Sequence, residues 1–262
     1  MATSSAPSIF DGGVDFDWKK YITHRPDYTA SNFYPLIWNY HERHSDRYVL
    51  AHDVGTGPGN VVEVLAKRFD RVIASDPSKF HVDVAQKRIN TIWFYGRPIF
   101  ADKKQEKCQD LYDNITSKAF ERIFPLKASQ VESAVKTMAS WLDIVIFPSE
   151  TWTDVQRIKW NNDKPLSFLG EEHFDHEIKY KSGVGPGDKI EMQVDRDFWA
   201  KEDCGVEWVK GFIDAQYLWE TTDDEIGAQL EPMYEELEAA MGGKGSTVKI
   251  AWPVVLLLAT KK

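Results

Sequence analysis

The sequence predicts an α/β protein built around a doubly wound, Rossmann-like parallel sheet. Two short apolar runs, residues 49–51 and 72–74, are each followed closely by an aspartate, Asp53 and Asp76. Between them lie a glycine-rich turn and a segment with apolar residues at helical spacing. This order of strand, turn, helix and strand is typical of a parallel βαβ unit. We therefore expect two neighbouring parallel strands whose carboxyl ends meet at one edge of a sheet.

The turn after the first run carries glycine at three alternate positions, Gly55, Gly57 and Gly59. Glycine allows a backbone to approach a ligand where a Cβ atom would clash. Residues 61–65 then open a helix whose first amides are expected to face that ligand. Asp76 follows Gly59 by 17 residues and closes the second run, where an acidic side chain can accept both hydroxyls of a ribose. The pattern predicts a nucleotide-type cofactor site.

The spacing of the glycines indicates which cofactor is bound. Dinucleotide sites read Gly-x-Gly-x-x-Gly, whereas this chain reads Asp-x-Gly-x-Gly-x-Gly from Asp53 onward. An acidic residue before the glycines suits the cationic amino acid end of S-adenosylmethionine. We therefore predict this cofactor, with a nicotinamide dinucleotide and a ligand-free connection as the weaker alternatives. The predicted cofactor-binding residues are Asp53, Gly55, Thr56, Gly57, Gly59, Asp76, Pro77 and Ser78.

Composition and charge favour an enzyme that acts on a small molecule. The chain has 262 residues, is 42% hydrophobic and carries a formal net charge of −9. A nucleic-acid surface would need a basic stripe, and none is present. The two cysteines form no Cys-x-x-Cys pair, and the longest apolar run, residues 254–259, is far shorter than a membrane span. We expect a cytoplasmic protein with neither a nucleic-acid nor a membrane partner.

A metal site is not expected. Residues 171–177 combine acidic and histidine side chains, but their spacing matches no zinc-protease or zinc-finger pattern. A solvated loop is the favoured interpretation.

Apolar periodicity predicts further elements in the first half of the chain. A helix over residues 33–44 precedes the first strand. Ser78 can cap a helix that runs to about residue 89, and residues 92–96 read as the next strand. Two more helices are expected over residues 104–124 and 130–142.

The second half is less regular. Short strand-like pieces are expected at residues 144–147 and 157–160, and an amphipathic helix over 206–217. Another helix should begin at Pro232, a residue tolerated in a first helical turn, and end at Gly242. The last strand should cover residues 248–260, with a bulge or edge position at Pro253 because proline cannot donate to a ladder.

Taken together, these motifs resemble class I S-adenosylmethionine-dependent methyltransferases, and within them the fungal and bacterial group typified by trans-aconitate methyltransferase. The segments that carry the resemblance are residues 24–28, similar to the Arg-Pro-x-Tyr motif of that group, residues 53–60 and 74–78 for the first two cofactor motifs, 94–96 for the end of the fifth strand, 208–219 for a late helix and 252–256 for the final strand. The glycine motif is specific for the cofactor class, and the other segments say little about substrate.

The resemblance implies methyl transfer to an oxygen, carboxylate or hydroxyl, of a small organic acid or secondary metabolite. A carboxylate substrate would need a cationic anchor, for which Arg25 and Arg97 are the candidates, with Tyr21 and Trp93 as possible walls. No catalytic residue is assigned, since positioning alone can supply much of the rate. The resemblance also implies a single domain. In it, residues 1–30 form a lid, 31–100 the cofactor core, 101–205 a substrate-side insertion and 206–262 the last helices and strands.

One departure from the family pattern is large. Only 16 residues separate Asp76 from Trp93, where the family places two further strands and two helices. On this comparison the sheet is expected to lack a central strand unless another segment replaces it. Residues 143–147 could fill the gap, the last strands could shift inward, or the chain could be a shortened product that folds poorly. The alternative function is accordingly a catalytically impaired, methyltransferase-like binding protein.

Overall fold

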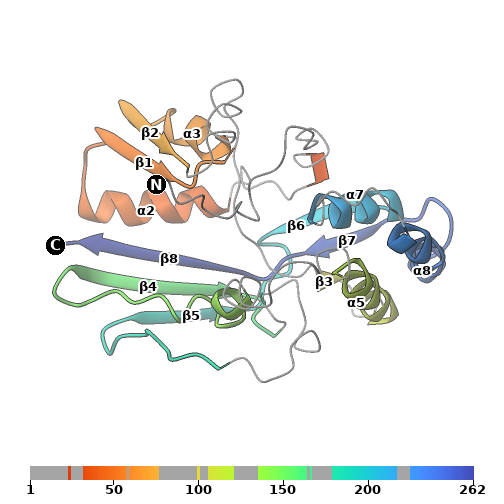
Figure 1. Cartoon of the computed structure of the whole chain (residues 1–262). Coiled ribbons are helices and arrows are strands. Elements are labelled where there is room, and N and C mark those ends of the chain that lie inside the picture. The colour runs from red at the N-terminus through yellow and green to blue at the C-terminus, as the bar shows by residue number, and fades with distance from the viewer. Residues whose placement is uncertain are drawn as a thin grey trace, which may run out of the picture. The chain divides into compact units, whose positions relative to one another are not determined.

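The computed structural model describes residues 23–24, 32–57, 59–76, 99–100, 106–120, 135–163, 166, 179–216 and 225–262. The chain divides into two compact units, which Figure 1 draws with their helices and strands labelled. Of the described residues, 32–57 and 59–76 belong to the first unit and the remainder to the second. Each unit is considered by itself.

The first unit contains the predicted βαβ arrangement. Helix α2 (Phe33–His44) precedes strand β1 (Leu50–Val54), and helix α3 (Asn60–Leu65) connects β1 to strand β2 (Arg71–Ser75). The strands are parallel and in register along their whole length, from Leu50 opposite Arg71 to Val54 opposite Ser75. The two apolar runs are thus confirmed as neighbouring parallel strands, and the helix over 33–44 is confirmed as well.

An aromatic cluster supplies the core of the first unit. Trp38 is 8% exposed on α2, and its ring lies 6.1 Å from that of Tyr48 and 6.3 Å from that of Phe69. The guanidinium of Arg68 lies 4.9 Å from the Trp38 ring and donates to Glu42, which covers the edge of the cluster with a surface ion pair. The cluster holds α2 against the chain segments that flank β1 and β2.

The strands of this unit bury little apolar surface. Leu50 is 46% exposed, Val54 75% and Ile73 40%, whereas strands of a complete parallel sheet are covered on both faces. Among the described residues, β1 pairs only with β2. Within the described part of the chain, none of the segments considered as substitutes for a central strand pairs with β1.

The described residues of the second unit form two three-stranded sheets. One is antiparallel, in the order β3 (Ile99–Phe100), β7 (Val248–Ala251) and β6 (Ala200–Cys204). The other has β4 (Trp152–Trp160) at its centre, with β5 (Lys189–Gln193) parallel on one side and β8 (Val254–Lys261) antiparallel on the other. The predicted strand at 157–160 is confirmed as the end of β4. Strands β5 and β6 fall in a stretch expected to be irregular.

The second unit also contains the helices α5 (Glu106–Phe120), α7 (Val206–Gln216) and α8 (Glu225–Met241). Residues 135–139, within the helix predicted over 130–142, are helical as well. Helices α5 and α8 pack side by side (Figure 1). Their apolar faces, with α7 and β7, form a core in which the residues with at most 1% exposure include Ile115, Val209, Phe212, Ile213, Leu230, Leu237, Ile250 and Trp252. The expected helices over 104–124 and 206–217 correspond to α5 and α7.

Two boundaries predicted from proline were wrong. Helix α8 begins at Glu225 and continues through Pro232, because Leu230 before the proline and Tyr234 after it are both buried in the core. The predicted last strand is two strands, since β7 and β8 belong to different sheets and are separated by Trp252 and Pro253. The C-terminal end of α8 was predicted correctly, as Gly242 has a φ of 119° and reverses the chain.

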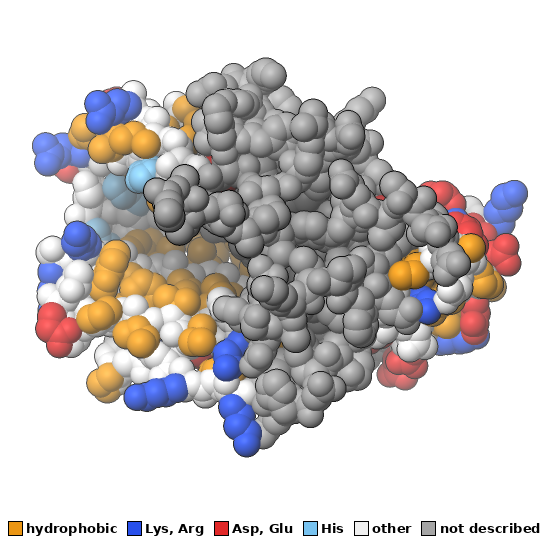
Figure 2. Space-filling view, in the orientation of Figure 1, with side chains coloured by type: hydrophobic (Ala, Val, Ile, Leu, Met, Phe, Trp, Pro, Cys, Tyr) orange, Lys and Arg blue, Asp and Glu red, His pale blue; other side chains and the backbone are white. Residues whose placement is uncertain are grey.

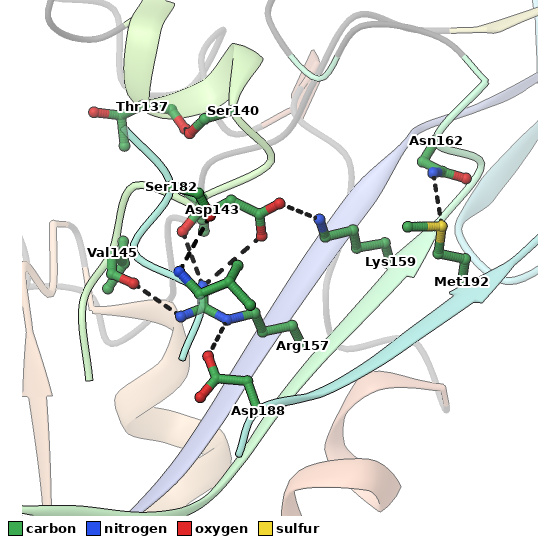
Figure 3. A network of polar contacts seen from close by, with 12 residues as sticks. Thr137, Ser140, Asp143, Val145, Arg157, Lys159, Asn162, Ser182, Asp188 and Met192 are labelled. Carbon is green, nitrogen blue, oxygen red and sulfur yellow. Dashed lines mark hydrogen bonds and ion pairs between the residues drawn. The ribbon is translucent and has the colours of Figure 1, made fainter. Parts of the chain in front are cut away.

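The segment 143–147 is not a strand, which corrects a third prediction. Its carbonyls are instead satisfied by a buried arginine from β4. Arg157 is fully buried, and its guanidinium donates to the carbonyls of Leu142 (3.2 Å) and Val145 (2.9 Å) and to Asp188 Oδ2 (2.7 Å). Lys159 donates to Asp143 Oδ2 at 2.7 Å. Figure 3 shows this network, in which the loop is tied to β4 by side chains and not by a ladder.

Hydrophobic side chains also gather on one face of the second unit, over β4, β5 and β8 (Figure 2). On β5 and just beyond it, Ile190, Met192 and Val194 are 46%, 62% and 76% exposed. The polar residues that alternate with them on β5 are also exposed or half-buried, so both faces of this strand are open to solvent. Strand β5 is an edge of its sheet within the described residues.

Candidate functional site

The glycine-rich turn leaves the carboxyl end of β1. Gly55, Gly57 and Gly59 have φ values of 75°, 50° and 89°. These left-handed conformations are disfavoured for residues with a Cβ by roughly 1–2 kcal/mol each. The alternate glycines are therefore required by the backbone itself, which is the physical basis of the motif recognised in the sequence.

The end of β2 holds the beginning of the turn. The carbonyl of Ser75 accepts hydrogen bonds from the amides of Gly55 (2.7 Å) and Thr56 (2.9 Å). Further along, the amide of Gly59 donates to the Thr56 carbonyl at 2.9 Å, just before α3 begins. The turn is thus fixed by backbone bonds from both ends. Because these acceptors are backbone carbonyls, which every residue has, the sequence could not have predicted these hydrogen bonds.

Two carboxylates converge on the turn. Asp76 Oδ2 accepts a hydrogen bond from the amide of Gly57 at 2.9 Å, and Asp53 Oδ2 accepts one from the hydroxyl of Thr56 at 2.7 Å. Thr56 itself is only 2% exposed. The acid expected to bind ribose therefore also braces the glycine turn, a second role that the sequence did not indicate.

The electrostatics of the turn centre on Asp53. Burial raises the pKa of its carboxyl above the ordinary value, and the neighbouring carboxylate of Asp76 raises the pKa further. The hydrogen bond from Thr56 and the charge of His52 act in the opposite direction. His52 lies on β1, where its Nε2 is 2.8 Å from Ser75 Oγ. Two acids in one place favour a ligand that brings positive charge or hydrogen-bond donors.

Gly55, the first glycine of the turn, is exposed. A Cβ atom built on Gly55 would meet no heavy atom within 4 Å. Gly55 is consequently required for its conformation and not because a neighbouring atom excludes a side chain. Thr56, Gly57 and Gly59 are buried behind it.

The structure brings six of the predicted cofactor residues together: Asp53, Gly55, Thr56, Gly57, Gly59 and Asp76. Pro77 and Ser78 lie outside the described residues, as do the substrate candidates Tyr21, Arg25, Trp93 and Arg97, the acidic segment 171–177 and the elements predicted over 78–89 and 92–96.

Within the second unit, the residue before one substrate candidate packs against a helix. The ring of His24, the residue before Arg25, lies against α7, where a Cβ on Gly211 would come within 2.2 Å of two ring atoms. Only a residue without a side chain fits at Gly211 while the ring is in this position.

Neither a metal cluster nor a membrane span is found in the described part of the chain. No group of three or more histidine, cysteine, aspartate or glutamate side chains there is arranged to hold a metal ion. No helix there combines the length and apolar character needed to cross a bilayer.

Curated fungal proteins are similar to the chain over most or all of its length. Methyltransferase cfoB of Aspergillus candidus is 32% identical, with 100% of both chains aligned. Methyltransferase pgmE of Aspergillus terreus is 32% identical over 93% of each chain, and methyltransferase ptaI of Pestalotiopsis fici is 30% identical over 100% of this chain and 97% of its own. The chain belongs to the methyltransferases. No family model matches it.

This methyltransferase lacks positions that its relatives have. The alignment with cfoB has 324 positions, whereas the chain has 262 residues, all of them included. About 62 aligned positions of the relative therefore have no counterpart here. A deficit of this size agrees with the short connection that follows Asp76 and with a β1 that has one strand partner within the described residues.

Proposed function

We propose that the protein is an S-adenosylmethionine-dependent methyltransferase of the trans-aconitate methyltransferase type. Its acceptor would be an oxygen, carboxylate or hydroxyl, of a small organic acid or secondary metabolite. The observation that carries the proposal is the glycine turn at the end of β1, with three positive φ values and two carboxylates bonded to it. We expect it to act in the cytoplasm, on small molecules and not on nucleic acid or membranes.

The residues of the turn fit this cofactor. Its amino acid end would lie against the exposed Gly55, and the Asp53 carboxylate would meet the positive charge there. Asp76, at the end of β2, would accept hydrogen bonds from the ribose hydroxyls while it keeps the Gly57 amide through Oδ2. A pyrophosphate would instead bring negative charge toward two acids, which argues against the nicotinamide alternative.

The chemistry supplied by S-adenosylmethionine, when bound, is a methyl group on a sulfonium that a substrate oxygen can accept. What the protein must contribute is alignment, which can be worth roughly 7 to 11 kcal/mol. A carboxylate acceptor is already ionised near neutral pH and requires no general base. Arg25 and Arg97 remain the proposed cationic anchors, with Tyr21 and Trp93 as walls. The contact of His24 with α7 supports a fixed path for the chain just before Arg25.

Calorimetry with S-adenosylmethionine and S-adenosylhomocysteine tests the cofactor assignment directly. We expect both to bind to the purified full chain at one site. Methyl transfer is then measured with radiolabelled cofactor and a panel of small mono-, di- and tricarboxylates and phenols. Absence of binding by either compound would overturn the assignment. Label that appeared only in phenols would move the acceptor class from carboxylate to hydroxyl.

The alternative function, a cofactor-binding protein with impaired catalysis, is favoured by a specific observation. About 62 positions of the relative are missing from this chain, and β1 has one strand partner among the described residues. In the family pattern the absent segment carries the adenine wall and one side of the reaction crevice. Such a protein would bind S-adenosylmethionine but transfer its methyl group slowly or not at all.

The two functions predict different results in the same assay. Tight binding of S-adenosylhomocysteine without transfer to any acceptor supports the alternative. Turnover at ordinary enzyme rates, on the order of 1 to 1000 per second, by a protein that melts cooperatively excludes it.

A further inference from the structure

Thr56 takes part both in the backbone hydrogen bonds of the glycine turn and in a hydrogen bond to the Asp53 carboxylate. Its amide donates to the Ser75 carbonyl at 2.9 Å and its carbonyl accepts from the Gly59 amide at 2.9 Å. These two bonds fix its backbone between β2 and α3. Its side chain is 2% exposed, so the hydroxyl has little access to water as a competing partner.

The hydroxyl is directed at the carboxylate of Asp53. The distance from Oγ1 to Asp53 Oδ2 is 2.7 Å, which is typical of a hydrogen bond to a charged acceptor. This bond occupies one oxygen and restrains the orientation of the carboxylate. We expect Oδ1 to be the oxygen that accepts from a ligand.

Asp53 needs such a partner because its surroundings oppose its charge. Asp53 is only partly exposed, and Asp76 at the end of β2 is a second acid acting on it. The groups that favour the ionised form are His52, on β1, and the Thr56 hydroxyl. Since His52 also contacts Ser75 Oγ, the hydroxyl of Thr56 is the partner bonded directly to the carboxylate.

We propose that Thr56 is a positioning residue of the cofactor site, whose hydroxyl holds the Asp53 carboxylate ionised and oriented toward the cationic amino acid end of the ligand. The inference deepens the proposed function and rests on it. Thr56 would not touch the reacting atoms. It would act through Asp53, and its loss should affect binding in a way that depends on pH.

The test compares Thr56→Val with Thr56→Ser. Valine keeps the branched shape and removes only the hydroxyl, whereas serine keeps the hydroxyl and removes a methyl group. We expect Thr56→Val to raise the Kd for S-adenosylmethionine about tenfold or more at neutral pH, and Thr56→Ser to bind like wild type. Because the pKa of Asp53 should rise without its donor, the pH at which half of the binding is lost should move upward in Thr56→Val.

A truncated ligand shows which end of the cofactor is affected. 5′-Methylthioadenosine has the adenine and ribose but no amino acid end. Its affinity should be the same for wild type and Thr56→Val if the hydroxyl acts through Asp53. Equal weakening of both ligands would indicate a collapsed turn and overturn the inference. So would wild-type affinity and pH dependence in Thr56→Val, or a serine variant as weak as the valine variant.

A measurement without ligand separates this inference from the proposed function. The carboxyl ¹³C resonance of Asp53 can be titrated in both proteins, and its midpoint should be higher in Thr56→Val. An unchanged midpoint overturns the inference even if cofactor binds. If the wild-type protein bound none of the three compounds, the proposed function would fail, while a shifted midpoint would still establish the hold of Thr56 on Asp53.

Discussion

The two units differ in how much of their structure is stabilised by buried side chains. In the second unit, helices and sheets enclose a dry core, and even a loop without ladder bonds is secured by the fully buried Arg157. In the first unit, two strands carry the cofactor turn while Val54 and Ile73 stay exposed. The turn is held by a few polar bonds around Ser75 and Asp76. Stability is therefore concentrated in one unit and the proposed chemistry in the other.

The largest effect should come from removing the buried arginine. Arg157→Met leaves Asp188, whose side chain is 5% exposed, without its ion pair, and leaves two loop carbonyls without donors. Breaking a buried pair by deleting one partner costs about 3–5 kcal/mol. Urea unfolding followed by tryptophan fluorescence measures the loss.

Arg68→Met in the first unit is the matched control. Its partner Glu42 is half-exposed, and methionine can still pack on the Trp38 ring. We therefore expect a much smaller loss in the free energy of unfolding than for Arg157→Met. If both variants lost the same stability, the contrast between the units would be wrong.

A second substitution challenges the turn. Gly57 has a φ of 50°, and valine there should add strain of about 1–3 kcal/mol and fill the space that the backbone offers to a ligand. We expect Gly57→Val to lose binding of S-adenosylmethionine by calorimetry. Gly243→Val is the control, since Gly243 has a φ of 96° in a turn of the second unit and open space around it. Retained binding by Gly57→Val would contradict the cofactor assignment.

The third prediction concerns Asp76. Asp76→Ala removes the acceptor for the Gly57 amide and the proposed acceptor for the ribose hydroxyls, so binding should weaken by about 1.5–3 kcal/mol. Asp70→Ala, an exposed acid just before β2, should leave the dissociation constant unchanged. A folded Asp76→Ala protein with wild-type affinity would exclude Asp76 from the site.

The smallest expected effect is a pH dependence of stability. The pKa of Asp53 is raised in the folded protein, chiefly by burial. Its contribution to stability is therefore fully present below the unfolded-state pKa and is lost as the pH rises through the folded-state pKa. Relative to Asp53→Asn, wild type should lose stability in the first unit as the pH rises from the ordinary pKa of an aspartate through the raised folded-state pKa of Asp53. Amide hydrogen exchange of β1 and β2 residues measures this loss of stability. The prediction is wrong if the exchange protection of wild type and Asp53→Asn changes with pH in the same way.

The sequence predicted the first unit better than the second because its signals are local. Apolar runs, three glycines and an acid within about thirty residues specify the βαβ unit, and the positive φ values explain why glycine is required. The cofactor prediction followed from the same segment, whereas the resemblance to methyltransferases also drew on segments up to residue 256. The hydrogen bonds of Ser75 and Thr56 to the turn involve backbone carbonyls, which carry no residue-specific signal.

The second unit depends on contacts between distant residues. Residues 144–147 have strand-forming side chains, yet Arg157 and Gly183 bond the carbonyls of their segment and hold it as a loop. Pro232 predicts the first turn of a helix. Leu230 and Tyr234 are nevertheless both buried, and α8 continues through the proline. Such outcomes are decided by tertiary packing, which overrides local preference.

The interruption at Trp252 and Pro253 has a consequence for synthesis on the ribosome. Strand β7 is the centre of one sheet and β8 closes the other, with β4 lying about a hundred residues earlier in the chain. Neither sheet can be completed before residues 248–261 emerge. The first unit has all its described strands by residue 75. Domains generally fold in the order of synthesis, so the glycine turn should form early, whereas β4 can pair with β5 but lacks β8 until the last strands have been made.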